Sequence, residues 1–264
     1  MRMMNIASGS SGNVTYVGSE HTHLLIDSGV SRKKILEGLK RLDLTLGDID
    51  AILISHEHSD HISSLGVLER TREIPIYATS GTANGILKCG FVGENSGLFH
   101  NIDADSSFVI GDIMVTALKI NHDAADPVCF RFDEKKSSCA VVTDLGEPTS
   151  YLKEHLTGLS ALILEANHDI RMLETGPYPY PLKMRIGGRK GHLSNESSGK
   201  FLSEILHDDM KHIALGHLSE KNNTADLALL TAKTEIEYAD NIYHAADFAI
   251  DIAHQTTGTE IYNF

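Results

Sequence analysis

The chain has 264 residues, and its 23 lysine and arginine residues against 36 aspartate and glutamate residues give a formal net charge of −13 at pH 7. This charge excludes general electrostatic attraction to nucleic acid or to an anionic membrane, so a polyanionic substrate must be held locally, by metal ions or a basic patch. The length allows a sizeable core, and we expect one layered α/β domain over residues 1–264.

Short apolar, β-branched segments flanked by turn residues predict strands. In chain order they cover residues 14–18, 23–27, 51–55, 75–79, 107–110, 114–120, 128–132, 139–144, 161–166, 212–216 and 247–252. Apolar residues at helical spacing predict helices at about 31–42, 62–72, 80–88, 149–157, 195–206 and 224–236. The segment "RMLETGPYPYPLKMRIGGRKG", residues 171–191, predicts an irregular insertion. This order favours two sheets covered by helices, although a doubly wound parallel sheet gives much of the same pattern.

The cysteines and the apolar segments predict the compartment. Cys89, Cys129 and Cys139 are an odd number without a CxxC pair, which argues against a disulfide framework and against a structural zinc ribbon. The first residues lack the apolar region of a signal peptide, and no segment reaches the roughly 20 apolar residues of a membrane span. We therefore expect a cytoplasmic protein with no membrane association, and no protein partner is implied.

The turn "HEHSDH", residues 56–61, joins a predicted strand to a predicted helix. In an extended turn His56 and His58 point to the same side, while Asp60 and His61 open the helix. Imidazole and carboxylate groups at such short spacing suit a divalent ion such as zinc, manganese or iron. The segment therefore predicts a metal site, in preference to a polar loop that is histidine-rich by chance.

Residues of the same types end other predicted strands. They are His122 and Asp123, Asp144, Glu165 with His168 and Asp169, and His217. Each one alone is more typical of a turn or a helix cap. Together they indicate a metal site presented at the ends of several strands, where rigid elements fix the side chains of the loops.

"HEHSDH" matches the HxHxDH signature, so the chain resembles the metallo-β-lactamase superfamily. It is more similar still to the YycJ/WalJ-like branch, through segments that extend over nearly the whole chain. These are "SGSSGN", "LLIDSGVS", "HDAADPV", "TDLGEPT", "EANHD", "GPYPYPLKMRI", "GHLSN" and "LGHLSEKNNT". The resemblance implies a four-layer αββα sandwich with two divalent metal ions, whether zinc, manganese or iron.

The resemblance also implies which residues bind the ions. His56, His58 and His122 would hold one ion, Asp60, His61 and His217 would hold the other, and Asp144 would bridge them. Asp60 would additionally orient the attacking water and accept its proton. For Asp27 and Glu165 the sequence leaves open whether they hydrogen-bond ligating histidines.

Members of this branch are regarded as nucleases, and the final segments are similar to tRNase Z, although its long tRNA-binding arm has no equivalent here. In that comparison His192 of "GHLSN" would protonate the leaving oxygen or grip the phosphate. The alternative is that His192 merely precedes a helix capped by Ser194 or Asn195. The two roles are compatible, because the free N–H groups of a helix terminus bind phosphate.

A basic segment before His192 predicts contacts with the substrate, since it lies in an acidic chain. Lys183, Arg185, Arg189 and Lys190 would bind the phosphate backbone without reading bases. Tyr178 and Tyr180 would stack on a nucleotide. The alternative is a solvated loop whose tyrosines pack locally. His168 is a candidate substrate contact, although a solvent-exposed turn histidine is the simpler interpretation.

Three classes of function remain open. The leading hypothesis is a metal-dependent phosphodiesterase or nuclease, most plausibly an exonuclease with a nucleic acid substrate, DNA rather than RNA. The alternative is a carbonyl hydrolase of the same fold, a thioesterase, lactonase or lactamase, for which the basic segment has no use. The third is a metal-binding regulatory protein without activity, against which the complete set of ligand-type residues argues.

Overall fold

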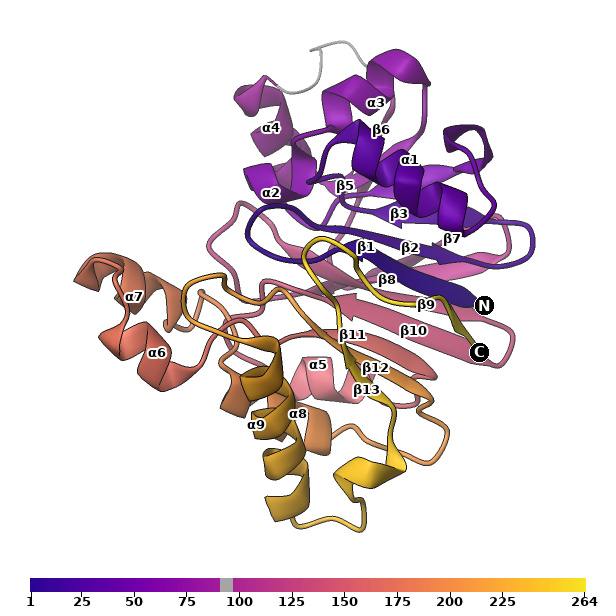
Figure 1. The fold of residues 1–264 in the computed structure, drawn as a ribbon. Coiled ribbons are helices and arrows are strands. Elements are labelled where there is room, and N and C mark those ends of the chain that lie inside the picture. Colours follow the sequence, from indigo (N-terminus) through magenta and orange to yellow (C-terminus); the bar gives the residue numbers. More distant parts are fainter. Residues whose placement is uncertain (91–96) are drawn as a thin grey trace.

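The computed structural model describes residues 1–90 and 97–264. Two seven-stranded sheets dominate the fold (Figure 1). The first has the order β14-β1-β2-β3-β4-β5-β6. Its strands are β1 (Arg2–Ala7), β2 (Val14–Gly18), β3 (His23–Ile26), β4 (Ala51–Leu53), β5 (Ile76–Thr79), β6 (Phe99–Ile102) and β14 (Tyr262–Asn263). Strands β3 to β6 run parallel to one another, so their carboxyl ends meet at one edge.

The second sheet has the order β13-β12-β11-β10-β9-β8-β7. Its strands are β7 (Ser106–Ile110), β8 (Ile113–Lys119), β9 (Val128–Glu134), β10 (Ser137–Val142), β11 (Ala161–Glu165), β12 (His212–Gly216) and β13 (Ile250–Ile252). Strands β10 to β13 are parallel, while β7, β8 and β9 pair antiparallel. The loops after β8, β10, β11 and β12 therefore leave this sheet at a common edge.

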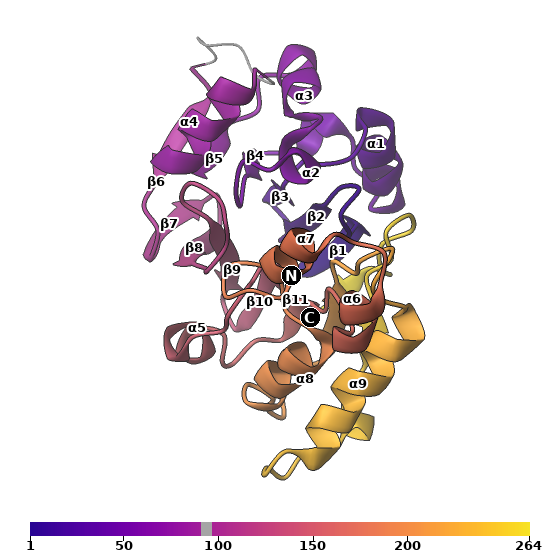
Figure 2. The ribbon, with the colours of Figure 1, turned by 90° about the vertical axis from the view of Figure 1, so that its left-hand side faces the viewer.

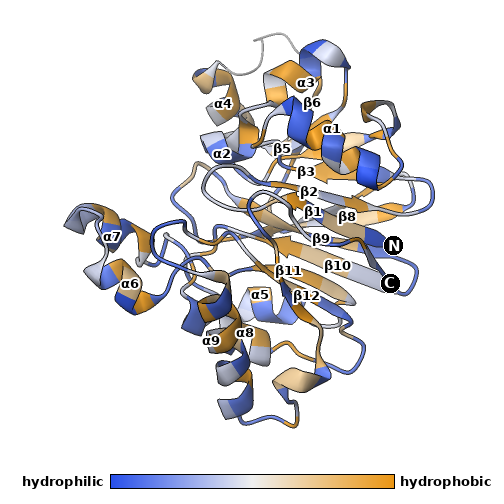
Figure 3. Cartoon of the chain, in the orientation of Figure 1, coloured by the Kyte–Doolittle hydropathy of each residue, from blue (hydrophilic) through white to orange (hydrophobic). Residues whose placement is uncertain are grey.

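Three apolar cores separate four layers, as Figure 2 shows end-on. The core between the sheets joins side chains of both, among them Leu24 and Phe130. Leu25, next to Leu24, faces the opposite way and packs in the core under α1 (Arg32–Arg41), α2 (Ser59–Ile62), α3 (Leu65–Thr71) and α4 (Ser80–Cys89). The third core lies under α5 (Ser150–His155), α8 (Asn195–Ser203) and α9 (Ala225–Tyr238). This confirms the predicted αββα sandwich, and Figure 3 shows how hydrophobic residues concentrate in its strands.

The prediction of an irregular insertion at residues 171–191 is wrong. The segment contains α6 (Ile170–Thr175) and α7 (Tyr180–Ile186), which project together from one edge of the sandwich (Figure 1). Its prolines suggested a loop, but Pro181 lies in the first turn of α7, where no N–H is needed for the helix. The predicted helix over 62–72 is two helices, α2 and α3, and the strands β1, β6 and β14 were not predicted.

None of the helices in residues 1–90 and 97–264 combines the length and apolar character that crossing a bilayer requires.

Candidate active site

The "HEHSDH" turn follows β4, and hydrogen bonds with buried polar side chains fix its conformation. The Asp27 carboxylate accepts hydrogen bonds from Ser55 N at 2.8 Å and from His61 Nδ1 at 2.8 Å. Ser55 Oγ lies 3.0 Å from Nδ1 of His56. His58 is the N-cap residue of α2, so Asp60 and His61 open that helix as the sequence predicted. Asp27 thus orients a histidine of the turn, one of the roles that the sequence left open.

Nδ1 of each of these buried histidines contacts another group of the protein, and Nε2 faces the interior of the cluster. Nδ1 of His61 bonds to Asp27, Nδ1 of His217 lies 2.7 Å from Glu165 Oε1, and Nδ1 of His122 lies 3.2 Å from the Gly191 carbonyl. When Nδ1 donates, the lone pair is on Nε2. Nε2 of His56 and Nε2 of His217 are buried and have no hydrogen-bond partner among the described residues. Such unpartnered lone pairs are what a cation requires.

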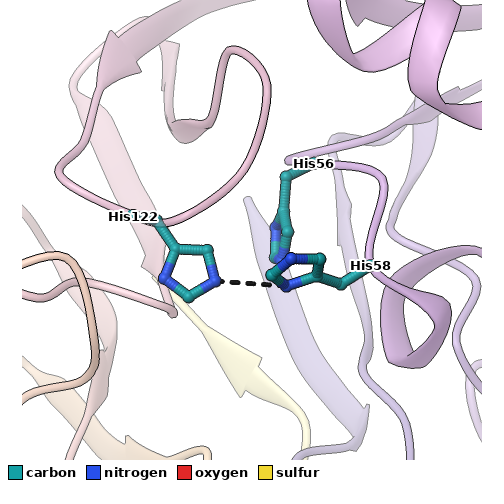
Figure 4. A group of neighbouring side chains, drawn as sticks. All are labelled: His56, His58 and His122. Carbon is teal, nitrogen blue, oxygen red and sulfur yellow. Dashed lines mark hydrogen bonds between the residues drawn. The ribbon is translucent and has the colours of Figure 1, made fainter. Parts of the chain in front are cut away.

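The spacing of these atoms also fits a cation. Nδ1 of His58 lies 3.3 Å from Nε2 of His122, and Figure 4 shows both rings beside His56. Two imidazole nitrogens bound at 2.0 to 2.1 Å to one tetrahedral ion lie about 3.3 Å apart. His56, His58 and His122 form one group whose donor atoms lie within 4.8 Å of one another, and Asp60, His61 and His217 form another. This is the donor set of a divalent-metal site.

Asp144 lies between the two groups. One of its oxygens is 3.1 Å from Nε2 of His61, and the other is 3.7 Å from Nε2 of His122. Burial disfavours its charge, but the neighbouring His217 and His61 outweigh burial and hold the pKa of Asp144 well below its ordinary value. Burial also opposes protonation of His61, yet Asp27 and Asp144 raise the pKa of His61 well above the usual range. Divalent ions bound here would displace such protons, so their binding would release protons.

The backbone is strained at three positions of the cluster. Asp27, Asp144 and His217 have φ values of 62°, 59° and 57°, in the left-handed region that residues other than glycine rarely adopt. Each lies just after a strand, and its side chain contacts a histidine or carboxylate of the site. Hydrogen bonds with neighbouring residues stabilise this strained conformation. At His217, the backbone N–H donates to Ser8 Oγ at 2.7 Å.

Glu165 is buried and accepts hydrogen bonds from both His217 of the cluster and His192. Its Oε1 lies 2.9 Å from Nδ1 of His192 and 2.7 Å from Nδ1 of His217. Its Oε2 accepts from the backbone N–H groups of Leu145 and Leu193. Burial raises the pKa of Glu165, but His192 and His217 outweigh it and lower the pKa to about 2. Burial likewise opposes protonation of His192, and Glu165 outweighs it, so the pKa of His192 is raised.

Asn13 is a site residue that sequence reasoning missed. Its Nδ2 lies 3.1 Å from Nε2 of His61 and 3.5 Å from Asp60 Oδ2. The side chain is fixed by Gly9, whose N–H donates to Asn13 Oδ1 at 2.9 Å. The "SGSSGN" loop therefore reaches the "HEHSDH" turn across the sheet edge. In the sequence, the only signal for Asn13 was its place in a segment shared with the YycJ/WalJ-like branch.

The predicted substrate contacts occupy different environments. Arg185 forms an ion pair with Asp123, and Arg189 pairs with Glu147 at 2.6 Å. Lys183 Nζ donates to the Glu174 carbonyl at 2.7 Å, and Lys190 is exposed. His192 lies at the cluster edge with Nδ1 3.6 Å from Asp144, and Ser194, two residues later, is the N-cap of α8.

The expectation that His168 is a solvent-exposed turn histidine is wrong. Only 3% of its surface is exposed. The reason is tertiary: His168 forms an isolated bridge with Ser194, and Asn195 N donates to the His168 carbonyl at 2.8 Å. A pairing of two loops 26 positions apart leaves no local signal in the sequence.

Comparison with known proteins identifies the family of this chain. A family model described as "Beta-lactamase superfamily domain" matches residues 22–208. The chain belongs to the metallo-β-lactamase superfamily. Within it, the chain is 37% identical over 240 residues to a protein named exodeoxyribonuclease YycJ from Bacillus anthracis, covering 88% of each chain. It is also 37% identical to a protein named exodeoxyribonuclease WalJ from Streptococcus pneumoniae, covering 89% of this chain and 88% of that one. These matches confirm the YycJ/WalJ-like resemblance.

The superfamily fold also appears in solved structures. The metallo-β-lactamase fold protein YhfI from Bacillus subtilis superimposes with a TM-score of 0.73 over 99% of this chain and 98% of that chain. Its sequence identity of 18% supports the fold alone.

Proposed function

We propose that this protein is a metal-dependent exonuclease that hydrolyses phosphodiester bonds at the ends of DNA. The observation that carries the proposal is the His192–Glu165 pair, 2.9 Å apart, at the edge of a histidine and carboxylate cluster. A phosphodiester needs an activated water on one side and a proton for the leaving oxygen on the other. The two named relatives support DNA as the substrate.

Two divalent ions fit the cluster, with zinc, manganese and iron all suited to these donors. His56, His58 and His122 would hold one, Asp60, His61 and His217 the other, and Asp144 would lie between. Bound there, such ions supply an acidified water and neutralise charge on a phosphoryl oxygen. Asp60 Oδ2 lies 3.6 Å from His61 and 3.7 Å from His217, and its side chain is 23% exposed. This position supports a role in which Asp60 would orient the attacking water and accept its proton.

His192 would act on the leaving oxygen. Because Nδ1 bonds to Glu165, Nε2 is the nitrogen available to substrate, and the Glu165 carboxylate raises the pKa of His192, which favours the protonated form that can donate. The exposed fraction of its side chain, 19%, is enough for contact with a phosphate. The same contact would serve to grip the phosphate before the bond breaks.

Removing one ligand tests the two-ion arrangement. In His217→Ala we expect one ion per chain instead of two after careful loading, because Asp60, His61 and the shared Asp144 leave one position of a four-coordinate site unfilled. Elemental analysis measures the count, and His21→Ala, an exposed histidine outside the cluster, is the matched control. An unchanged count in His217→Ala, or one ion in the wild type, would contradict the assignment.

The basic residues should differ in their contribution to DNA binding. Lys190 has no ion-pair partner within residues 1–90 and 97–264, whereas Arg185 and Arg189 are each paired with a carboxylate. We expect Lys190→Ala to lower the slope of log affinity against log salt by about 0.9, the loss of one phosphate contact. Arg185→Ala and Arg189→Ala should change it less. Equilibrium binding between 50 and 200 mM salt, roughly the range over which such slopes are measured, provides the data.

Lys136, exposed in the turn between β9 and β10, is the control for this series. That turn precedes β10, while Asp144 follows it, so Lys136 lies at the opposite edge of the sheet. Lys136→Ala should leave the slope at the wild-type value. A reduction equal to that of Lys190→Ala would show that the effect is only one of total charge.

The activity itself is tested on several substrate classes at once. Purified protein is incubated with end-labelled single- and double-stranded DNA and RNA, with manganese, zinc or a chelator, beside a chromogenic lactam and a thioester. We expect metal-dependent release of nucleotides from DNA ends and no cleavage of lactam or thioester. Cleavage of the carbonyl compounds without digestion of nucleic acid would instead establish a carbonyl hydrolase, and metal binding without any cleavage would indicate a regulatory protein.

A further inference from the structure

A cavity of about 480 Å³ lies between the α6–α7 pair and the start of α8. It adjoins the metal cluster, because His192 and Gly146 form part of its wall and Gly146 follows Asp144 by two residues. Cavities of about 300 to 1,000 Å³ are typical of sites for small organic molecules. Of the residues given a role above, Lys183 and His192 border this space, and no role proposed for the metals or Asp60 uses it.

One side of the cavity is apolar, and the other carries polar groups that include the charged side chains of Lys183 and Glu174. Ile170, Leu173 and Met184 form apolar parts of the wall, and Tyr180 adds an aromatic ring. His168 is 97% buried, with Nδ1 3.4 Å from Asn167 Oδ1 and no hydrogen bond at Nε2 among the described residues. Burial lowers the pKa of His168 to about 4, so the ring is neutral near pH 7 and offers one donor and one acceptor.

The cavity is poorly suited to a phosphate. Ser197 N donates to Ser194 Oγ and Asn195 N to the His168 carbonyl, so these N–H groups of the α8 terminus are already used. Lys183 is directed to the Glu174 carbonyl, and the acidic Glu174 itself lines the cavity. An anion here would meet the Glu174 carboxylate as well as the Lys183 ammonium, whose opposite charges offset each other. A flat, uncharged, hydrogen-bonding group matches the wall better.

We propose that this cavity is a binding site for the terminal nucleoside of the strand being digested, with the base between the α7 side chains and His168. The inference rests on the proposed nuclease function and specifies its substrate. A phosphodiester at His192 would be joined directly to a nucleoside in the cavity, since His192 borders both. Placing a base there requires unstacking, which is least costly where a base is already unpaired. Frayed ends supply such bases, which accounts for a preference for ends.

Direct binding of a nucleoside without phosphate tests the site independently of catalysis. The probe is the fluorescent deoxynucleoside of 2-aminopurine, titrated against the metal-loaded protein. We expect saturable quenching that inorganic phosphate and deoxyribose 5-phosphate do not reverse. Tyr180→Ala and His168→Ala should weaken the binding roughly 5- to 100-fold, as loss of one base–aromatic or buried polar contact does. Competition by inorganic phosphate, or absence of saturable binding in the wild type, would overturn the proposal.

Matched variants separate a local effect from a loss of fold. Tyr180 and Met184 are 72% and 58% exposed, so Tyr180→Ala and Met184→Ala retain the core even where His168→Ala does not fold. Tyr238 is 83% exposed at the end of α9 and is not part of the wall, so Tyr238→Ala should bind the probe as the wild type does. Equal weakening in Tyr238→Ala and Tyr180→Ala would contradict a site in this cavity.

Substrates with an altered end distinguish this proposal from the proposed function. DNA whose terminal nucleotide lacks its base should be cleaved at the first bond at least roughly 5-fold more slowly than DNA with the abasic residue several nucleotides inside. Equal first-bond rates would overturn the nucleoside site while leaving the nuclease function intact. Probe binding without digestion of any DNA would instead overturn the nuclease function and retain a nucleoside site.

Discussion

In His192→Ala, turnover on DNA should fall by roughly 10²- to 10⁴-fold, the usual consequence of losing a general acid. The reason lies in the geometry: Nδ1 of His192 is held by Glu165 at 2.9 Å, which leaves Nε2 to donate to the leaving oxygen. His192 is not a member of the two proposed metal groups, and His217 keeps its own bond to Glu165 when His192 is removed, so the metal content should not change. Initial rates on end-labelled DNA and elemental analysis of the same samples measure both quantities.

The metal content of His192→Ala distinguishes a general acid from a metal ligand. The donor atoms of His192 also lie within 4.8 Å of those of Asp144, Glu165 and His217, an arrangement in which His192 itself could be a ligand. A loss of metal in parallel with the loss of turnover would assign His192 to the metal. His192→Gln should be as slow as His192→Ala, because an amide can hydrogen-bond a phosphate but has no proton to give at neutral pH.

The metal cluster was predictable because its residues lie where strands end. His56, His122, Asp144 and His217 are distant in sequence, yet each follows a segment that reads as a strand. Parallel strands bring such ends to one edge of a sheet, and two packed sheets bring two edges together. The residue types at those positions then indicated metal binding without any knowledge of the contacts.

The surroundings of the cluster were not predictable in the same way. Pro177, Pro179 and Pro181 indicated a loop, although the short helix α7 tolerates proline in its first turn. The pairing of Arg185 with Asp123 joins residues 62 positions apart, and no local pattern encodes it. The same holds for the positive φ of His217, since histidine seldom adopts this conformation and only the assembled site stabilises it.

Glu165→Gln should be the more damaging substitution, although it changes the side chain least in size. Oε1 of Glu165 accepts from His192 and His217, and Oε2 accepts from Leu145 N and Leu193 N, so all four neighbours are donors. An amide NH₂ in either position faces two donors. If it faces the backbone, two N–H groups lose their partner at about 1 to 3 kcal/mol each. If it faces the histidines, they must move their protons to Nε2.

A proton on Nε2 of His217 removes the lone pair that points into the cluster. We therefore expect Glu165→Gln to weaken binding of the ion at His217 by roughly 10- to 100-fold, as loss of a group that orients a metal ligand typically does. Turnover should fall at least as far as in His192→Ala. Metal titration and DNA digestion measure the two effects, and Glu147→Gln, an exposed carboxylate paired with Arg189, is the control. Metal affinity and turnover equal to those of the wild type would contradict the role of Glu165.

The double variant Glu165→Gln with His192→Ala decides whether Glu165 acts on turnover through His192. At metal concentrations that fill both sites, the double variant should be no slower than Glu165→Gln alone, because residues that act as a unit are not additive when removed. If the two losses multiply instead, His192 receives its proton without Glu165, and the carboxylate serves only His217 and the metal. Titrating all three variants with metal to saturation separates these outcomes. At saturation the effect of Glu165 on metal affinity no longer lowers turnover, whereas its effect on the proton of His192 still does.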